Sequence, residues 1–275
     1  MADQQISPES VPKPNQARIY DYLLGGHNSL PVDREVADAL LALTPIARAT
    51  AVENRRFLGR AVRLLAARGI RQFLDVGAGL PTQENVHQIA QQAAPDARVL
   101  YVDNDPTVIA EGQALLTNED QVAMAEADLR QPASIFALPE VHRLLDFRQP
   151  IALLLIGVLY FISEDEDPYS MVTQLRDALA PGSYLAISHA TRDTLTPEQL
   201  AEGTRIYSRG PGATLRTRVQ IERFLDGFDL VDPGLVLVSD WRPDGRLPSS
   251  ADTPAMFGAV GQVRYGGKVS AASDG

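Results

Sequence analysis

The chain has 275 residues, a formal net charge of -10 at pH 7 and no cysteine, with 45% hydrophobic and 22% charged residues. This is the composition of a folded globular protein, and the length suits one large domain with a modest appendage. The missing cysteines exclude disulfides, thiolate metal sites and a cysteine nucleophile, and the acidic balance argues against binding to a nucleic-acid backbone.

The first 14 residues are polar and contain three prolines, which predicts a flexible arm. They lack the basic segment and apolar core of a secretory signal, and the longest apolar run, residues 151–162, is too short to cross a bilayer. We therefore expect a cytoplasmic protein without a membrane partner.

Residues 15–69 are predicted to form a helical extension. The segment Asn15–Ser29 places apolar residues before Gly25-Gly26, which would end a helix, and residues 31–43 and 49–68 also show helical spacing. The first helix is either a ligand lid, with Arg18 and Tyr22 contacting the ligand, or a docking helix that covers the sheet. The arginines of the third helix are expected on a solvated face: Arg55, Arg56, Arg60 and Arg63.

From residue 70 to 268, apolar strands alternate with helical segments, which predicts one α/β domain, followed by a tail at residues 269–275. Strands are expected near residues 72–76, 98–102, 122–125, 151–156 and 184–188. Residues 234–238 and 256–263 have no clear helix between them, which indicates an antiparallel pair at one edge of an otherwise parallel sheet.

Three loops at strand ends carry polar residues suited to a nucleoside. The first strand contains Asp75 and is followed by Gly77 and Gly79, which let a ligand lie against the backbone. Pro81 fits the first turn of a following helix, whose positive end would favour a polar ligand group. Asp103 ends the second strand, where a carboxylate accepts both ribose hydroxyls, and Asp128 follows the third, where it faces an adenine amino group.

Three stretches, L-D-V-G-A-G-L-P-T, Y-V-D-N-D-P and A-D-L-R, resemble the cofactor motifs of class I S-adenosylmethionine-dependent methyltransferases. With A-R-I-Y-D-Y-L-L-G-G, R-D-A-L-A-P-G-S-Y-L and S-H-A-T, the chain resembles the S-adenosyl methyltransferase family, formerly a domain of unknown function, over residues 14–268. The resemblance implies a Rossmann-like, mostly parallel seven-stranded sheet with an antiparallel edge strand. It also implies S-adenosyl-L-methionine as cofactor but supplies no substrate, and we expect an unidentified small-molecule acceptor.

The resemblance assigns the site residue by residue. Asp75, Gly77 and Gly79 would line the methionine side of the cofactor, Asp103 would hold the ribose with Asn104 beside the adenine, and Asp128 and Leu129 would hold the adenine edge. Gly157 and Tyr160 follow the fourth strand, where class I enzymes face the transferred methyl group. Pro81 stands where a third glycine is usual, so Arg18 and Tyr22 are expected to help hold the methionine end.

No catalytic group is assigned from the sequence. Tyr160 is a candidate or a core aromatic, and His189 is either a base or a hydrogen-bonded structural histidine. No metal site is expected, since no histidine and carboxylate pair has ligand spacing. Two alternatives stay open, a non-catalytic protein that binds S-adenosylmethionine or its demethylated product, and a nicotinamide-dependent oxidoreductase. The oligomeric state also stays open.

Overall fold

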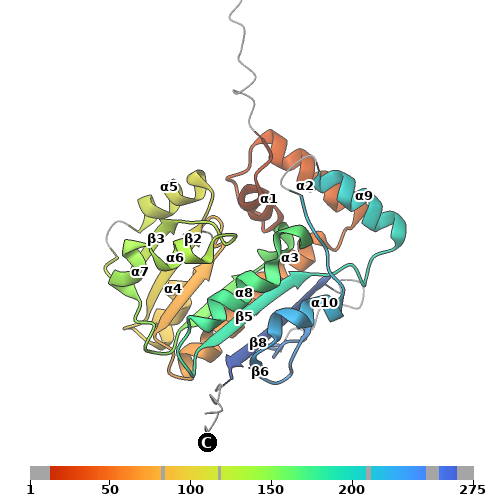
Figure 1. Cartoon of the computed structure of the whole chain (residues 1–275). Coiled ribbons are helices and arrows are strands. Elements are labelled where there is room, and N and C mark those ends of the chain that lie inside the picture. Colours follow the sequence, from red (N-terminus) through yellow and green to blue (C-terminus); the bar gives the residue numbers. More distant parts are fainter. Residues whose placement is uncertain (1–12, 82–83, 117–118, 209–211, 246–253, 265–275) are drawn as a thin grey trace, which may run out of the picture.

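The computed structural model describes residues 13–81, 84–116, 119–208, 212–245 and 254–264. Within these ranges eight strands form one sheet with the order β3-β2-β1-β4-β5-β8-β6, and β7 also pairs with β8 (Figure 1). The strands are β1 (Gln72–Val76), β2 (Arg98–Asp103), β3 (Val122–Glu126), β4 (Ala152–Ile156), β5 (Tyr184–Ala190), β6 (Phe228–Leu230), β7 (Val236–Leu237) and β8 (Met256–Val263).

The first five strands run parallel, whereas β8 runs antiparallel to β5, β6 and β7. Parallel strands need crossover connections, and helices supply them. The helices are α1 (Gln16–Leu23), α2 (Pro31–Leu43), α3 (Ala47–Ala67), α4 (Val86–Ala93), α5 (Pro106–Leu115), α6 (Pro132–Phe136), α7 (Pro139–Leu144), α8 (Pro168–Asp177), α9 (Pro197–Tyr207) and α10 (Arg218–Glu222). Short 3-10 turns lie at η2 (Leu159–Phe161), η3 (Glu164–Glu166) and η4 (Arg223–Leu225).

Alternation along the strands divides the core between the two faces of the sheet. On β1, Phe73 packs into a core with residues of α3, α4 and α5, while Leu74 and Val76 pack into a second core with residues of α6, α7, α8 and α10. All five residues of β1 are buried, as expected for a central strand covered on both faces. This places the carboxyl end of β1 at the middle of one sheet edge.

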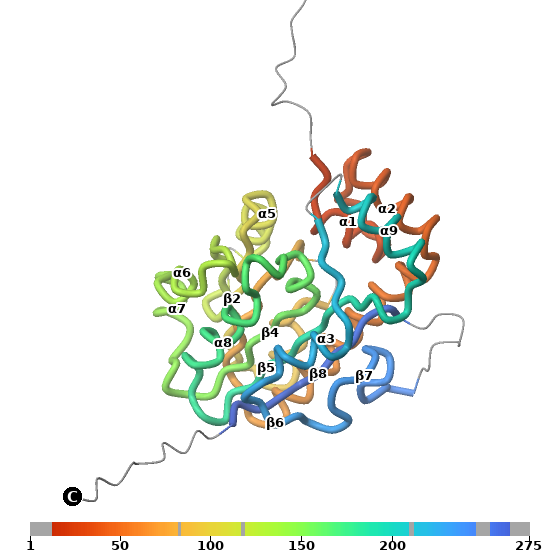
Figure 2. The backbone as a smooth tube through the Cα atoms, turned by 45° about the vertical axis from the view of Figure 1, so that its right-hand side comes forward, coloured from red at the N-terminus to blue at the C-terminus, as the bar shows by residue number. Residues whose placement is uncertain are grey.

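Three helices form a separate group above that edge. Helices α1, α2 and α9 share a small core of their own, to which Ile19, Val36, Leu40 and Ile206 contribute (Figures 1 and 2). In both views this group, which we call the cap, stands apart from the helices that cover the sheet. The fold therefore brings residues 16–43 and 197–207 together beside the strand ends.

The fold class and the mostly parallel sheet are confirmed, as is the antiparallel pairing of residues 236–237 with β8. The antiparallel strand β8 lies inside the sheet, because the short β6, missed in the sequence, pairs with its outer side. Helix α9 lies in a polar stretch that the sequence pattern did not place. The sequence predicts a boundary between the helical extension and the α/β domain at residues 69 and 70. Helix α3, which precedes this boundary, packs on the sheet, and α9, which follows it, packs on the cap. Residues 1–12 of the predicted arm (residues 1–14) and the whole predicted tail (residues 269–275) lie outside the described residues.

Candidate functional site

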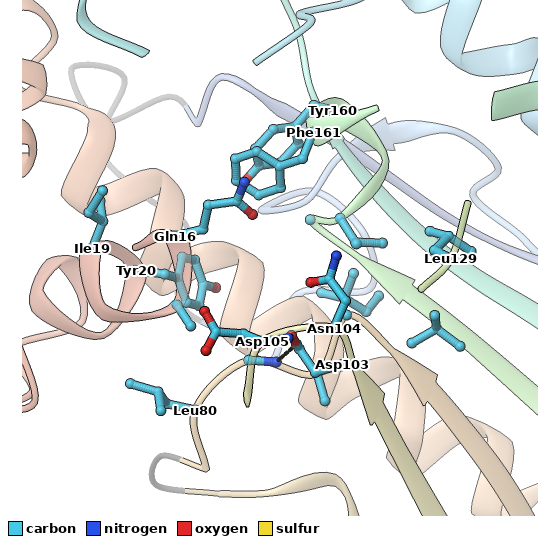
Figure 3. A pocket seen from close by; sticks show the side chains of 18 of the residues that line it. Gln16, Ile19, Tyr20, Leu80, Asp103, Asn104, Asp105, Leu129, Tyr160 and Phe161 are labelled. Carbon is cyan, nitrogen blue, oxygen red and sulfur yellow. Dashed lines mark hydrogen bonds between the residues drawn. The ribbon is translucent and has the colours of Figure 1, made fainter. Parts of the chain in front are cut away.

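A cavity of about 420 Å³ lies where the ends of β1 to β4 meet the cap. A volume of this size suits a drug-sized ligand or cofactor. Figure 3 shows Gln16, Ile19 and Tyr20 of α1 on one side, Asp103, Asn104 and Asp105 below, and Tyr160 and Phe161 above. Each group comes from a different segment, so the cavity exists only in the folded chain.

The turn after β1 brings backbone to the cavity wall. Gly77 has φ of 76° and Gly79 has φ of 66°, which are left-handed conformations that side chains disfavour. A Cβ on Gly77 would lie 2.3 Å from a methyl carbon of Val158, so this turn packs directly on the β4 exit. A Cβ on Gly79 would meet nothing closer than Ala17, at 4.0 Å. The backbone at Gly79 therefore leaves open space for a ligand.

The carboxylate of Asp103 is fixed by two backbone donors. Gly79 N–H donates to one oxygen at 2.9 Å and Asp105 N–H donates to the other at 3.0 Å. Burial raises the pKa of Asp103, while these N–H groups oppose the shift. Each oxygen has a second lone pair, and the residue lines the cavity, so the pair can accept two adjacent hydroxyls.

The loops after β2 and β3 are joined through side chains. Asn104 donates to an Asp128 oxygen at 3.2 Å, and the Arg130 guanidinium lies 3.3 Å from the other Asp128 oxygen. Leu129, next to this pair, is buried and lines the same cavity. The loop after β2 is also held to the residue before α1, because the side-chain amide of Asn15 donates a hydrogen bond to the Asp105 carboxylate. The predicted residues Asp103, Asn104, Asp128 and Leu129 are thus brought together on one wall.

Asp75 and Arg55 form the floor beneath the first glycine turn. Asp75 is buried, and this burial raises its pKa to about 7, opposed by the nearby Arg55 guanidinium and increased by Asp103. The Arg55 guanidinium also donates to the carbonyl of Glu84 at 3.1 Å. Both residues line the cavity, so this end combines a cation with a carboxyl group that titrates near neutral pH.

Another part of the cavity lining is aromatic. It contains Tyr20 from α1, Tyr160 from η2 and Tyr207 from α9, and both Asn54 from α3 and Tyr160 lie next to Gly157. Burial raises the pKa of Tyr160 well above its ordinary value, and the Tyr207 and Tyr20 hydroxyls add to the rise. Tyr160 is therefore a neutral phenol at physiological pH.

Two predicted cofactor residues lie outside the cavity, which corrects the sequence expectation. The Arg18 guanidinium forms an ion pair of 2.5 Å with Asp33, whose carboxylate is fully buried and also accepts the N–H groups of Asn15 and Leu30. Tyr22 points to Asp38, with a 3.0 Å hydrogen bond. Both side chains bind α1 to α2 rather than facing a ligand, because the opposite face of α1, with Gln16, Ile19 and Tyr20, looks into the cavity.

His189 lies outside the cavity lining and fits the second of its two expected roles, that of a hydrogen-bonded structural histidine. It is fully buried, its Nδ1 contacts the carbonyl of Ala190 at 2.7 Å, and its Nε2 lies 2.9 Å from the Arg216 guanidinium. The carbonyl accepts the Nδ1 proton, so Nε2 accepts from Arg216. Burial first, and then the Arg216 charge, lower the pKa of His189 to about 3. It remains neutral and connects β5 to Arg216 through a hydrogen bond.

Two further expectations are wrong for reasons of packing. Pro81 lies before α4 rather than in its first turn, since that helix begins at Val86, and the helix start does not line the cavity. Arg60 is buried rather than solvated, and donates to the carbonyls of Trp241 and Val238. The third helix is therefore an inner element, and this explains why Asn54 and Arg55 reach the cavity. The i, i+3, i+4 spacing of Asn54, Phe57 and Leu58 was the available signal.

None of the helices in the described ranges is long and apolar enough to cross a membrane. In the same part of the chain, no group of three or more His, Asp or Glu side chains is placed to hold a metal ion.

Comparison with known proteins decides the family. A sequence model of the S-adenosyl methyltransferase family matches residues 3–264, nearly the whole chain. The chain belongs to the S-adenosyl methyltransferase family. No curated protein sequence matches this family member significantly.

Two crystal structures are similar to this S-adenosyl methyltransferase family member over almost their full length. A proposed methyltransferase from Thermobifida fusca is 40% identical, with a TM-score of 0.88 over 96% of this chain and 100% of that one. A DUF574 family protein from Streptomyces avermitilis is 41% identical, with a TM-score of 0.87 over 92% of this chain and 98% of that one. An O-methyltransferase family protein from Burkholderia thailandensis is 15% identical, covers 80% and 60%, and with a TM-score of 0.51 shares the fold alone.

Proposed function

We propose that this family member binds S-adenosyl-L-methionine in the cavity and transfers its methyl group to a small-molecule acceptor. The observation that carries the proposal is the convergence of Gly79, Asp103 and Asp128 on one wall, in a chain of this family. The fit is chemical as well as spatial. The carboxylate pairs with hydroxyls, the neighbouring amide and acid with an adenine edge, and Gly79 leaves room for close approach.

The chain's own residues would hold the cofactor at fixed points. Asp103, oriented by Gly79 and Asp105, would accept the ribose hydroxyls, while Asn104, Asp128 and Leu129 would border the adenine. Arg55 replaces Arg18 as the proposed partner of the methionine carboxylate, because it lies in the cavity beside Asp75. Asp75 would then face the methionine ammonium from the strand end.

When bound, the cofactor supplies a methyl carbon on a positively charged sulfur, which leaves with the bonding electrons when a nucleophile's lone pair takes the methyl group. The protein's contribution is to hold the acceptor in line and to exclude water, and positioning of this kind accounts for much of the rate. The cap helix α1 closes one side of the cavity, and Asn15 fastens it to Asp105 at the β2 exit.

Calorimetry tests the proposal directly. We expect S-adenosylmethionine and S-adenosylhomocysteine each to bind one site per chain, and NAD⁺, the ligand of the oxidoreductase alternative, to show no saturable binding. Absence of binding by either adenosyl ligand at millimolar concentration would contradict the proposal. A mass-spectrometric screen of metabolites then tests for methylated products. If the protein binds both ligands but methylates no metabolite, the alternative of a non-catalytic binding protein is correct.

A further inference from the structure

The acidic turn η3 lies outside the cavity lining but holds one of the arginines that line it. One carboxylate oxygen of Glu166 lies 2.5 Å from the Nε of Arg130. The other oxygen accepts hydrogen bonds from the backbone N–H and the hydroxyl of Ser163, at 2.7 and 2.8 Å. The Ser163 N–H first, and then Arg130, lower the pKa of Glu166 to about 2. Glu166 is therefore an anion with a fixed position.

The Arg130 guanidinium is shared between this anion and Asp128. Its Nη2 donates to the carbonyl of Phe161 at 3.2 Å, which holds a second side of the planar group. Its Nη1 then reaches the two Asp128 oxygens only at 3.3 and 3.5 Å. Hydrogen bonds between charged groups usually measure about 2.7–2.9 Å. The short contact of Arg130 is thus with Glu166, and its contact with Asp128 is long.

This arrangement leaves Asp128 able to accept further hydrogen bonds. Its carboxylate receives the backbone N–H of Arg130 at 2.9 Å and the Asn104 amide at 3.2 Å, and it lines the cavity. Two oxygens provide about four lone-pair sites. A guanidinium turned fully onto Asp128 would occupy both oxygens in a bidentate pair and would direct its own N–H groups at a ligand. Glu166 opposes that rotation.

We propose that Glu166 determines base specificity, because it holds Arg130 away from Asp128 and so keeps Asp128 open to the amino group of adenine. An exocyclic amino group donates to a carboxylate. A carbonyl in its place, as in hypoxanthine, is repelled by a carboxylate and bound by a guanidinium. The site therefore rejects the deaminated cofactor. Glu166 acts through Arg130 and is a positioning residue, and the inference rests on the proposed function because it concerns the base of the same cofactor.

Calorimetry with S-adenosylhomocysteine and S-inosylhomocysteine, in which a carbonyl replaces the adenine amino group, measures the preference. We expect wild-type protein to bind the adenosyl ligand at least about tenfold more tightly, as for one hydrogen bond to a charged group. Equal affinity for the two ligands overturns the proposal without any variant being made. Failure to bind S-adenosylhomocysteine contradicts the proposed function itself, so the two failures are distinct.

Glu166→Gln keeps the shape of the side chain and removes its charge. Asp165→Asn, an exposed neighbour in the same turn and also outside the cavity lining, is the matched control. In Glu166→Gln the Arg130 guanidinium should turn onto Asp128, and the preference should fall to about twofold, whereas Asp165→Asn should keep the wild-type preference. An unchanged preference in Glu166→Gln overturns the proposal.

Arg130→Gln separates this role from a general effect on the turn. Once the arginine is removed, Glu166 has no guanidinium to hold. Arg130→Gln and the double variant Arg130→Gln/Glu166→Gln should therefore agree within about twofold, and both should prefer the adenosyl ligand at least about tenfold. A double variant with a preference as low as that of Glu166→Gln would show that Glu166 does not act through Arg130, and would overturn the proposal.

Discussion

Two parts of the cavity lining are built in different ways. On the wall proposed for the cofactor, the polar groups lie at or just beyond the carboxyl ends of three strands, in residues 75–79, 103–105 and 128–130. On the aromatic part of the lining, Tyr20, Asn54, Tyr160 and Tyr207 come from four separate segments, namely α1, α3, η2 and α9. The first group follows mainly from the order of the strands, with Arg55 of α3 added beside Asp75, whereas the second depends on how the cap and α3 pack against the sheet.

The largest expected effect comes from Gly77, on the wall proposed for the cofactor. Gly77→Ala combines a disfavoured positive φ with overlap against Val158, and should lower the free energy of unfolding by about 2–5 kcal/mol. Gly69→Ala is the matched control, because its φ of 92° is equally unfavourable but nothing lies within 4 Å. It should cost only about 1–2 kcal/mol. Urea unfolding of both variants measures the difference, and equal losses would remove the packing argument.

Asp75 should make stability depend on pH. Its pKa is raised from 3.8 to about 7 in the folded state, so the folded chain keeps the proton longer than the unfolded chain. Stability of the wild type should therefore fall, relative to Asp75→Asn, as pH rises from about 4 to about 7. The relative slope approaches about 1.4 kcal/mol per pH unit. Urea unfolding at several pH values compares the two curves. Parallel curves would show that Asp75 ionises normally.

The Asp103→Ala substitution tests the proposed contact between Asp103 and the ribose. The loss of hydrogen bonds from a charged group should weaken S-adenosylhomocysteine binding by about 1.5–3 kcal/mol, measured by calorimetry. Asp229→Ala is the control, since Asp229 is an exposed acid that pairs with Arg264 on the surface. An unchanged affinity in Asp103→Ala would place the ribose elsewhere.

Substitutions of two arginines distinguish a residue that binds the cofactor from a residue that holds α1 against α2. Arg55→Ala should lower S-adenosylhomocysteine affinity about tenfold or more, since a hydrogen bond to a charged group contributes about 1.5–3 kcal/mol. Arg18→Ala should instead lower the free energy of unfolding by a similar amount, because buried Asp33 loses its cation, and should leave affinity within twofold. Calorimetry and urea unfolding on both variants give the comparison. A loss of affinity in Arg18→Ala, with unchanged affinity in Arg55→Ala, would show instead that α1 binds the cofactor through Arg18.

Tyr22→Phe should have the smallest effect. Its hydroxyl contacts Asp38 away from the cavity, so calorimetry should show no measurable change in S-adenosylhomocysteine affinity. A clear loss of affinity would mean that α1 rotates when ligand binds.

The sequence determined the sheet, its parallel strands and most residues of the wall proposed for the cofactor. The reason is local, since strand alternation and glycine turns are properties of neighbouring residues, and parallel strands bring their carboxyl ends to one edge. The positions of Asp103 and Asp128 follow from that rule alone.

Only the tertiary structure decided which helix faces meet the ligand. Helical spacing shows that a face is buried but does not say against what, so Arg18 was assigned to the ligand although it pairs with Asp33, and Arg55 was assigned to solvent although it lines the cavity. His189 likewise forms a hydrogen bond with Arg216, which lies 27 residues away in the chain. Asn54 and Tyr20, which are 34 residues apart, form a hydrogen bond only because α1 packs against α3. Contacts between segments far apart in the chain depend on packing, and packing is decided by the whole fold at once.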